Sequence, residues 1–142
     1  MALMFEPFRK YAIFSGRARR REYWGFLLLL TIIATALTIW LFAALGGQPA
    51  AGTPEAFEAM VSAGGPAMWA LSALSVFYLF TIIPSLAVSV RRLHDSDKSG
   101  WWLLLSFVPA GALVLFIFYL LDGTPGSNRH GADPKARRST RS

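Results

Sequence analysis

The sequence contains no cysteine among its 142 residues. This absence excludes disulfides, zinc–thiolate sites, iron–sulfur clusters and thiolate nucleophiles. Charged residues are also scarce, at 15% of the chain against about 25% in typical soluble domains. A soluble protein of this size exposes much of its surface to water and needs more charged side chains to cover it. The scarcity of charge therefore argues against a soluble fold.

Lys, Arg, Asp and Glu are absent from three long runs, at about 23–45, 67–90 and 101–121. A helix of any of these lengths crosses the roughly 30 Å hydrocarbon core of a bilayer. Helix is the expected state, because an isolated strand in lipid leaves its backbone N–H and C=O groups unpaired. The first run is also too long for the apolar core of a cleaved signal peptide, about 7–15 residues. We therefore predict an all-α membrane protein, a single membrane domain with three transmembrane helices.

The segments outside the runs differ in character. Residues 1–15 place aromatic and charged side chains at helical spacing, which predicts a short amphipathic helix at headgroup level, with a frayed terminus as the alternative. Residues 46–66 form a loop rich in Gly, Ala and Pro, where Thr53-Pro54 favours the start of a short helix. Residues 91–100 form a short hairpin loop. Residues 122–142 form a polar basic tail, and we expect its last eight or so residues to be disordered.

The distribution of the 14 Lys and Arg residues indicates the orientation. Six precede the first run, none lies in residues 46–66, three lie in residues 91–100 and five in the tail. The positive-inside rule places the N-terminus and the 91–100 loop in the cytoplasm, and the 46–66 loop outside. A full third crossing, which we favour, then puts the tail outside. Pro109-Ala110-Gly111 interrupts the third run, however, and a re-entrant helix pair would return the tail to the cytoplasm.

A basic and aromatic cluster, GRARRREYW, lies at the start of the first run. Guanidinium groups bind phosphate, and Tyr and Trp favour the headgroup level of a membrane. The cluster is interpreted as a membrane anchor or, more specifically, as a site for anionic lipid headgroups or a protein partner. The candidate binding residues in this cluster are Arg17, Arg20, Arg21 and Trp24.

A second polar cluster, RRLHDSDKSGWW, separates the second run from the third. The spacing of Arg91 and Asp95 predicts an ion pair at the end of a helix, and Asp97 or Ser99 is placed to cap the next helix. A histidine beside a carboxylate also suggests a proton acceptor, so a membrane enzyme using His94 and Asp95 is one hypothesis. No nucleophile or metal-ligand set accompanies them, and we expect no enzymatic activity, no metal and no cofactor. The candidate binding residues in this cluster are Arg91, Arg92, His94 and Asp95.

One face of the second run carries small and hydroxyl-bearing side chains at helical spacing. Its members are Ser75, Tyr78, Thr81, Ser85, Ser89 and Arg92. Such a face favours close helix packing, a homo-oligomer interface or a polar path. An oligomeric small transporter or channel subunit is therefore the alternative function. Against it, the three runs lack the charged side chain that coupled transport usually requires.

A third motif, GTPGSNRHGADP, begins at Gly123 and predicts successive tight turns. With FSGRARRREYW and RRLHDSDKSGWW before it, the chain resembles the domain of unknown function 805 family of small bacterial inner-membrane proteins. The resemblance covers nearly the whole chain and departs from the family at His130, where tyrosine is common. It implies a multi-pass inner-membrane location, and it supplies no activity and no site residues.

The net charge of +6 lies beside the apolar runs. We therefore expect contacts with anionic headgroups of the bilayer, and no binding of nucleic acid. The prediction is an integral inner-membrane protein with its N-terminus in the cytoplasm. Its expected role is that of a non-catalytic component that binds lipid, another membrane protein or a second copy of itself.

Overall fold

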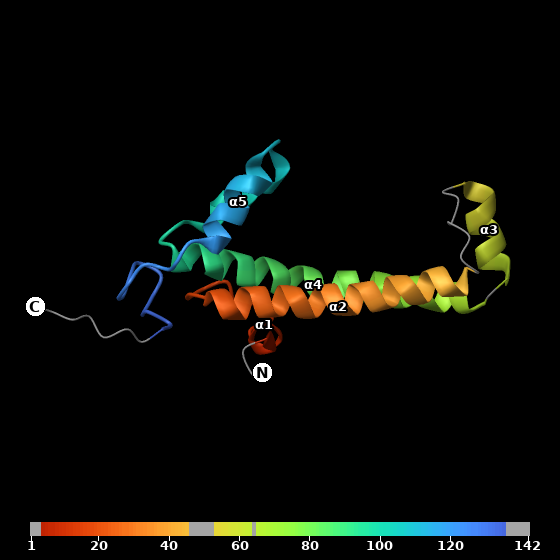
Figure 1. Ribbon diagram of the computed structural model, residues 1–142, viewed down its shortest axis with the longest axis horizontal. Helices are drawn as coiled ribbons and strands as arrows, with labels where there is room; N and C mark the ends of the chain where they lie inside the picture. The colour runs from red at the N-terminus through yellow and green to blue at the C-terminus, as the bar shows by residue number, and fades with distance from the viewer. Residues whose placement is uncertain (1–3, 46–52, 64, 136–142) are drawn as a thin grey trace, which may run out of the picture. The chain divides into compact units, whose positions relative to one another are not determined.

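The computed structural model describes residues 4–45, 53–63 and 65–135, and these residues form helices joined by turns (Figure 1). The elements are α1 (Glu6–Arg9), α2 (Arg20–Ala44), α3 (Pro54–Ala63), α4 (Pro66–Asp95), the 3₁₀ helix η2 (Gly100–Phe107) and α5 (Gly111–Leu120). The described residues contain no strand beyond one isolated bridge between Asn128 and Gly131. The prediction of an all-α protein is confirmed. The expected disorder of the last eight or so residues falls largely outside the described residues.

The two long helices account for the first two apolar runs. α2 has 25 residues and α4 has 30, so at 1.5 Å per residue they measure about 38 and 45 Å. Both are long and apolar enough to cross a bilayer. Their outward surfaces are apolar too, since Ile39 is 63% exposed and Leu79 is 69% exposed. Large apolar side chains facing outward at this density suit lipid as the surrounding solvent, and the chain is an integral membrane protein.

The third apolar run differs from the single transmembrane helix expected over 101–121. It forms two helical pieces, η2 and α5, which pack against each other. Pro109 has no N–H and disfavours helical geometry at the residue before it, and Val108 is accordingly extended. Ala110 takes a left-handed conformation with φ of 62°. Gly111 then lies against the Leu105 carbonyl so closely that a Cβ at position 111 would clash with it.

The lengths of the two pieces fit a re-entrant hairpin. η2 has eight residues and α5 has ten, so each rises about 15–16 Å, roughly half of the hydrocarbon core. In the turn, the N–H groups of Val108 and Gly111 are bonded to the carbonyls of Leu105 and Val108. Pro109 has no N–H to satisfy. The single helix expected over 101–121 is therefore corrected to a helical hairpin, the form that the re-entrant alternative requires.

The predictions for the shorter segments are confirmed in some places and corrected in others. α3 begins at Pro54, and the Thr53 carbonyl accepts a bond from Phe57, so the short helix in the 46–66 loop is confirmed. Ser99 caps η2 through its hydroxyl, which accepts a bond from the Trp101 N–H. The amphipathic helix expected in residues 1–15 is a single turn, α1. Its Phe8 ring meets Phe26 edge-on, with ring centroids 5.1 Å apart.

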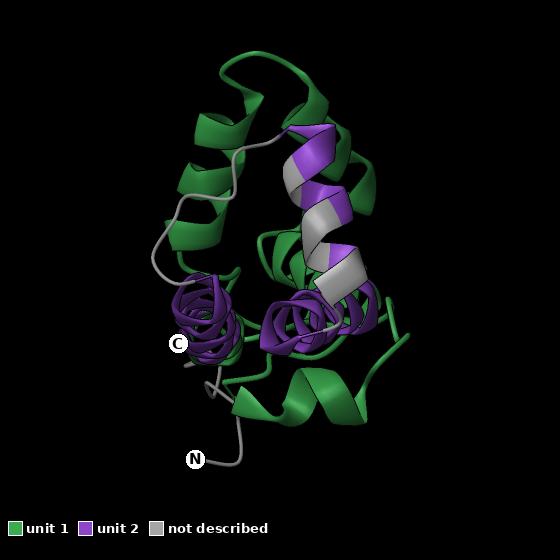
Figure 2. Ribbon diagram, turned by 90° about the vertical axis from the view of Figure 1, so that its right-hand side faces the viewer, with its two compact units in different colours: residues 1–27, 83–142 green, residues 28–82 purple. Residues whose placement is uncertain are grey.

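The chain divides into two compact units (Figure 2). One unit comprises residues 1–27 and 83–142, and the other comprises residues 28–82. The first unit contains α1, the first turns of α2, the last turns of α4, the hairpin and the tail. All of the polar motifs identified in the sequence belong to this first unit, and every feature of the site described below lies within it.

Candidate functional site

Arg17 joins the N-terminal segment to the tail. Its side chain is 1% exposed and its Nε donates to Asp95 Oδ1 at 2.9 Å. The two terminal nitrogens donate to the carbonyls of Thr124 and Gly126, each at 2.6 Å. One buried guanidinium thus bonds a carboxylate on α4 and two backbone carbonyls more than 100 residues away. Such charge-assisted bonds are about twice as strong as neutral ones.

Asp95 is shared between two arginines. Arg92 Nη1 donates to the second carboxylate oxygen of Asp95 at 2.9 Å, and its other terminal nitrogen bonds the Leu121 carbonyl at the end of α5. The backbone N–H of Thr124 donates to the Asp95 carbonyl at 2.8 Å. Gly123 lies so close to the Asp95 carboxylate that a Cβ there would clash with it. The end of α4 and the end of α5 are therefore bound to each other, as the hairpin requires.

Arg91 makes a different ion pair from the one that its spacing suggested. Its Nη1 donates to Glu22 Oε1 at 2.7 Å, and both side chains are buried. The Arg91 carbonyl also accepts a bond from the Ala18 N–H at 3.0 Å. The predicted pair between Arg91 and Asp95 is therefore wrong. Asp95 pairs instead with Arg17 and Arg92, which leaves Arg91 to neutralise the buried Glu22 carboxylate.

His94 does not pair with the neighbouring carboxylate either. Its Nδ1 lies 3.2 Å from the Gly16 carbonyl, and its ring stacks on His130 with centroids 3.9 Å apart. Burial lowers the pKa of His130 below its ordinary value of 6.5, and the adjacent Arg129 guanidinium lowers it further. The hypothesis that Asp95 orients His94 as a proton acceptor finds no contact to support it, because both Asp95 oxygens are engaged by arginines.

The remaining tail contacts are a mixture of buried and exposed bonds. Asn128 Nδ2 donates to the His94 carbonyl and to the Thr124 hydroxyl, each at 2.9 Å. Arg129 pairs with Asp97 at 3.2 Å on the exposed surface. The turns of the tail use Gly126 and Gly131, whose φ values are 75° and 132°. The successive turns expected from the third motif are confirmed, and they place the tail against the end of α4.

A basic cavity of about 490 Å³ lies at the start of α2. Its lining residues are Arg19, Arg20, Arg21 and Lys135. Asp122 is close by, since it pairs with Arg20 at 3.6 Å and also with Lys135. Among the described residues, neither Arg19 nor Arg21 has an ion-pair partner. The cavity therefore gathers four cations, two of which are without a carboxylate.

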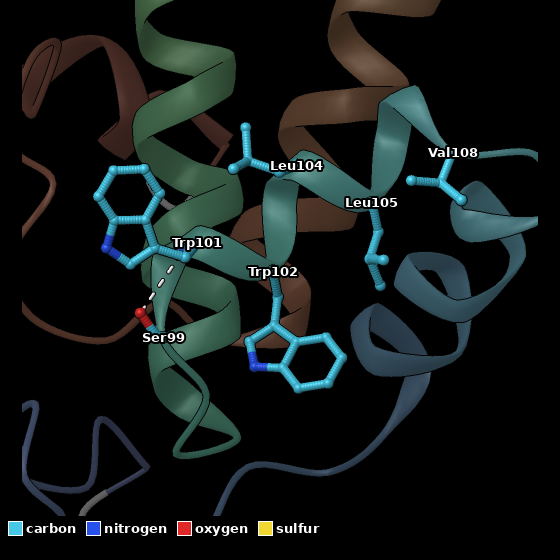
Figure 3. A pocket seen from close by; sticks show the side chains of 6 residues that line it. All are labelled: Ser99, Trp101, Trp102, Leu104, Leu105 and Val108. Carbon is cyan, nitrogen blue, oxygen red and sulfur yellow. Dashed lines mark hydrogen bonds between the residues drawn. The ribbon is translucent and has the colours of Figure 1, made fainter.

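A second cavity, of about 410 Å³, is apolar and lies on η2 (Figure 3). It is lined by Ser99, Trp101, Trp102, Leu104, Leu105 and Val108. Figure 3 shows Leu105 pointing toward α5, and the Trp102 ring meets Phe118 of α5 edge-on at 5.4 Å. The residues that line this cavity carry no charge.

The eight candidate residues thus fall into groups with different surroundings. Arg20 and Arg21 line the basic cavity, and Trp24 packs beside the hairpin, its Nε1 donating to the Tyr119 carbonyl at 3.3 Å. The others are Arg17, Arg91, Arg92, Asp95 and His94, which are held by contacts within the molecule.

Sequence reasoning did not name Lys135 or Glu22 as site residues. Lys135 joins the cavity only because the tail folds back, and no local pattern marks it. Glu22 had a visible signal: a carboxylate within the arginine run, in the first turn of an apolar helix, needs a cationic partner when it is buried. That partner, Arg91, is 69 residues away.

Known proteins resemble this chain over most of its length. Residues 11–132 match the family described as "Protein of unknown function (DUF805)". The Escherichia coli K12 protein named "Inner membrane protein YhaI" is 42% identical over 129 residues, which cover 89% of this chain and 90% of the relative. The E. coli K12 protein named "Inner membrane protein YhaH" is 39% identical over 128 residues, which cover 89% and 91%. No solved structure matches the chain.

Proposed function

We propose, from the premise that the chain belongs to the DUF805 family, that it is an inner-membrane protein that binds anionic lipid headgroups and catalyses no reaction. The observation that carries this proposal is the cavity lined by Arg19, Arg20, Arg21 and Lys135. Cationic side chains that line one cavity attract phosphate, and arginine binds it with two parallel hydrogen bonds. The names of the E. coli relatives support the inner-membrane location.

The position of the cavity along the chain suits a headgroup. Its arginines lie at and just before the first turn of α2, and Tyr23 and Trp24 follow Glu22 within one turn. Tyr and Trp favour the level of the headgroups. A basic residue near an anionic leaflet adds about 1 kcal/mol of attraction. The arginines of the cavity would therefore meet lipid phosphates at the depth where those phosphates lie.

The proposed orientation places this cavity in the cytoplasm. The 46–66 loop contains no Lys or Arg, whereas the N-terminal segment, the 91–100 loop and the tail each contain several. Because Arg17 binds the tail carbonyls, the tail lies on the same side as the N-terminal segment and the 91–100 loop. The Lys and Arg residues that the structure describes then lie on one side. The positive-inside rule supports that side as the cytoplasmic one, where the anionic leaflet attracts basic surfaces.

The contacts of the second cluster support a non-catalytic role. The Asp95 carboxylate is bound by two arginines, and His94 stacks on His130. The Asp95 carboxylate is therefore placed neither to accept a proton itself nor to orient His94. The transporter alternative gains no support from the described part of the second run, where the hydroxyls of Ser75 and Thr81 donate to carbonyls of their own helix.

Lipid binding by a pair of variants with equal charge tests the proposal. The full-length protein in neutral detergent is titrated with phosphatidylglycerol and, separately, phosphatidylcholine, and bound lipids are counted by native mass spectrometry. Arg19→Gln/Arg21→Gln removes two cavity charges, and Arg9→Gln/Lys10→Gln removes two charges from α1. At about 1 kcal/mol per charge, the cavity variant should lose roughly 30-fold in phosphatidylglycerol affinity.

The α1 variant serves as the control for the loss of charge. The α1 variant should lose much less affinity, because Arg9 and Lys10 pair with Glu6 outside the cavity. Helical content measured by circular dichroism should be unchanged in both variants. Equal losses in the two variants, or no preference of the native protein for phosphatidylglycerol over phosphatidylcholine, would contradict the proposal.

A further inference from the structure

The basic cavity holds more positive charge than one lipid phosphodiester neutralises. Four cationic side chains against the single carboxylate of Asp122 leave three positive charges. A ligand with one negative charge would leave most of that charge uncompensated. Since like charges held close together repel one another, a ligand that carries several negative charges gains the most by binding here.

The number of guanidinium groups that line the cavity allows more than one phosphate position. Arg19 and Arg21 both line the cavity; Arg19 directly precedes α2, and Arg21 lies in its first turn. Each guanidinium presents a fork of donors that fits one phosphate group.

The size of the cavity agrees with this reading. Its volume of about 490 Å³ corresponds to about 16 water molecules at about 30 Å³ each. A single phosphate group has five non-hydrogen atoms and fills only a fraction of that space. Lys135, which comes from the tail, supplies a third cation on a separate segment of the chain. Two phosphate groups joined by a short linker would occupy the space and engage cations from both segments.

We infer that the cavity selects a ligand that carries two phosphate groups over a ligand that carries one. This inference rests on the proposed function and specifies its ligand class. Two sources share this chemistry: a diphosphatidylglycerol lipid and a soluble diphosphate. The Asp122 carboxylate, which holds Arg20 and Lys135, orients two of the cations and limits the positive charge on their side of the cavity. The second phosphate is therefore assigned to Arg19 and Arg21.

Titrations with one-phosphate and two-phosphate ligands at equal total phosphate test the inference. The full-length protein in neutral detergent is titrated with diphosphatidylglycerol and with phosphatidylglycerol at matched total phosphate, and native mass spectrometry gives the affinity for each. In parallel, inorganic pyrophosphate and inorganic phosphate are titrated while thermal unfolding is followed. We expect at least a tenfold preference for one two-phosphate ligand over its one-phosphate counterpart, and Arg19→Gln/Arg21→Gln should reduce that preference to within twofold.

Each outcome decides the inference. A preference for diphosphatidylglycerol with no effect of pyrophosphate supports a lipid ligand, and a preference for pyrophosphate supports a soluble one. Equal affinity for the one-phosphate and two-phosphate members of both pairs overturns the inference and leaves the proposed lipid binding intact. A preference that survives in Arg19→Gln/Arg21→Gln also overturns it, because another site must then be responsible. If the native protein bound no anionic lipid at all, the proposed function itself would be refuted.

Discussion

Replacing Arg17 by Gln should release the tail from the rest of the first unit. The Arg17 side chain is 1% exposed and bonds Asp95, Thr124 and Gly126. Gln removes the positive charge and cannot reach all three partners. Asp95 would keep Arg92 as a partner, but the Thr124 and Gly126 carbonyls would lose their charged donor.

The size of the effect follows from the bonds that are lost. Arg17 makes two charge-assisted bonds to tail carbonyls, and losing both costs about 3–6 kcal/mol at about 1.5–3 kcal/mol per bond. At about 1.4 kcal/mol per factor of ten, this cost corresponds to an increase of more than a hundredfold in the open population of the tail. The helical spans are stabilised by their own backbone bonds and by lipid. The change should therefore be a local opening of residues 122–135, not loss of the membrane fold.

Hydrogen–deuterium exchange measures that opening directly. Peptides covering residues 122–135 should lose at least a hundredfold in protection in Arg17→Gln, while peptides from the apolar part of α4 serve as an internal reference. Arg129→Gln is the matched control, because Arg129 also connects the tail to the 91–100 loop, through Asp97. That pair is exposed, 61% and 46% for the two side chains, so its loss should cost at most about 1 kcal/mol, roughly fivefold in protection.

The comparison of the two variants can refute the reasoning. If Arg17→Gln and Arg129→Gln reduce protection equally, the buried network does not hold the tail. Unchanged protection in Arg17→Gln would have the same meaning. A uniform loss that extends into the apolar part of α4 would show that the network stabilises the whole protein, contrary to the local opening expected here.

Three further predictions concern the hairpin and the tail. Because the native chain has no cysteine, the single substitutions Ser127→Cys and Glu55→Cys can be labelled with a membrane-impermeant maleimide. The re-entrant hairpin predicts that the two cysteines are labelled from opposite sides of the membrane, and labelling from the same side would contradict it. Gly123→Ala should lower the unfolding temperature far more than Gly126→Ala. The new Cβ at position 123 would clash with the buried Asp95 carboxylate, whereas the Cβ at position 126 meets open space and costs only about 1 kcal/mol for its left-handed φ. Equal shifts in unfolding temperature would exclude close packing of Gly123 against Asp95. Because the pKa of His130 is lowered in the folded protein, docking of the tail should be fully stable above pH 6.5, the ordinary pKa of histidine, and should weaken as the pH falls through the lower folded pKa. Limited proteolysis should therefore cut the tail faster at pH 5 than at pH 7.5. His130→Phe, which keeps a stacking ring, should reduce this difference.

Much of the fold was predictable because membrane helices are encoded locally. The first two runs lack Lys, Arg, Asp and Glu over more than 20 residues, and helix is the conformation that satisfies an isolated backbone in lipid. The start of α3 at Pro54 and the cap at Ser99 were also readable from nearby residues. The third run misled the prediction because its length alone allowed a full crossing. Its outcome depended on the turn at Pro109 and on contacts made by residues beyond it.

The candidate site was predictable in composition but not in geometry. The sequence placed the arginines at the start of the first apolar run, and in the structure they lie at and just before the first turn of α2. It could not separate Arg17, which is buried, from Arg19 and Arg21, which line an open cavity, because all three belong to one run. Helical spacing favoured Asp95 as the partner of Arg91. The nearby arginines instead competed for the same carboxylate, and Arg17 and Arg92 occupy it.

The sequence by itself therefore determined the solvent, the helical class and the location of the polar clusters, since hydropathy and backbone satisfaction act on each segment independently. Only the tertiary structure decided which cations have a carboxylate partner among the described residues. The reason is that each buried charge needs a specific partner within a few ångströms. For Arg17 and Arg91 those partners come from residues 69 to 109 positions away, and only the folded chain brings them together.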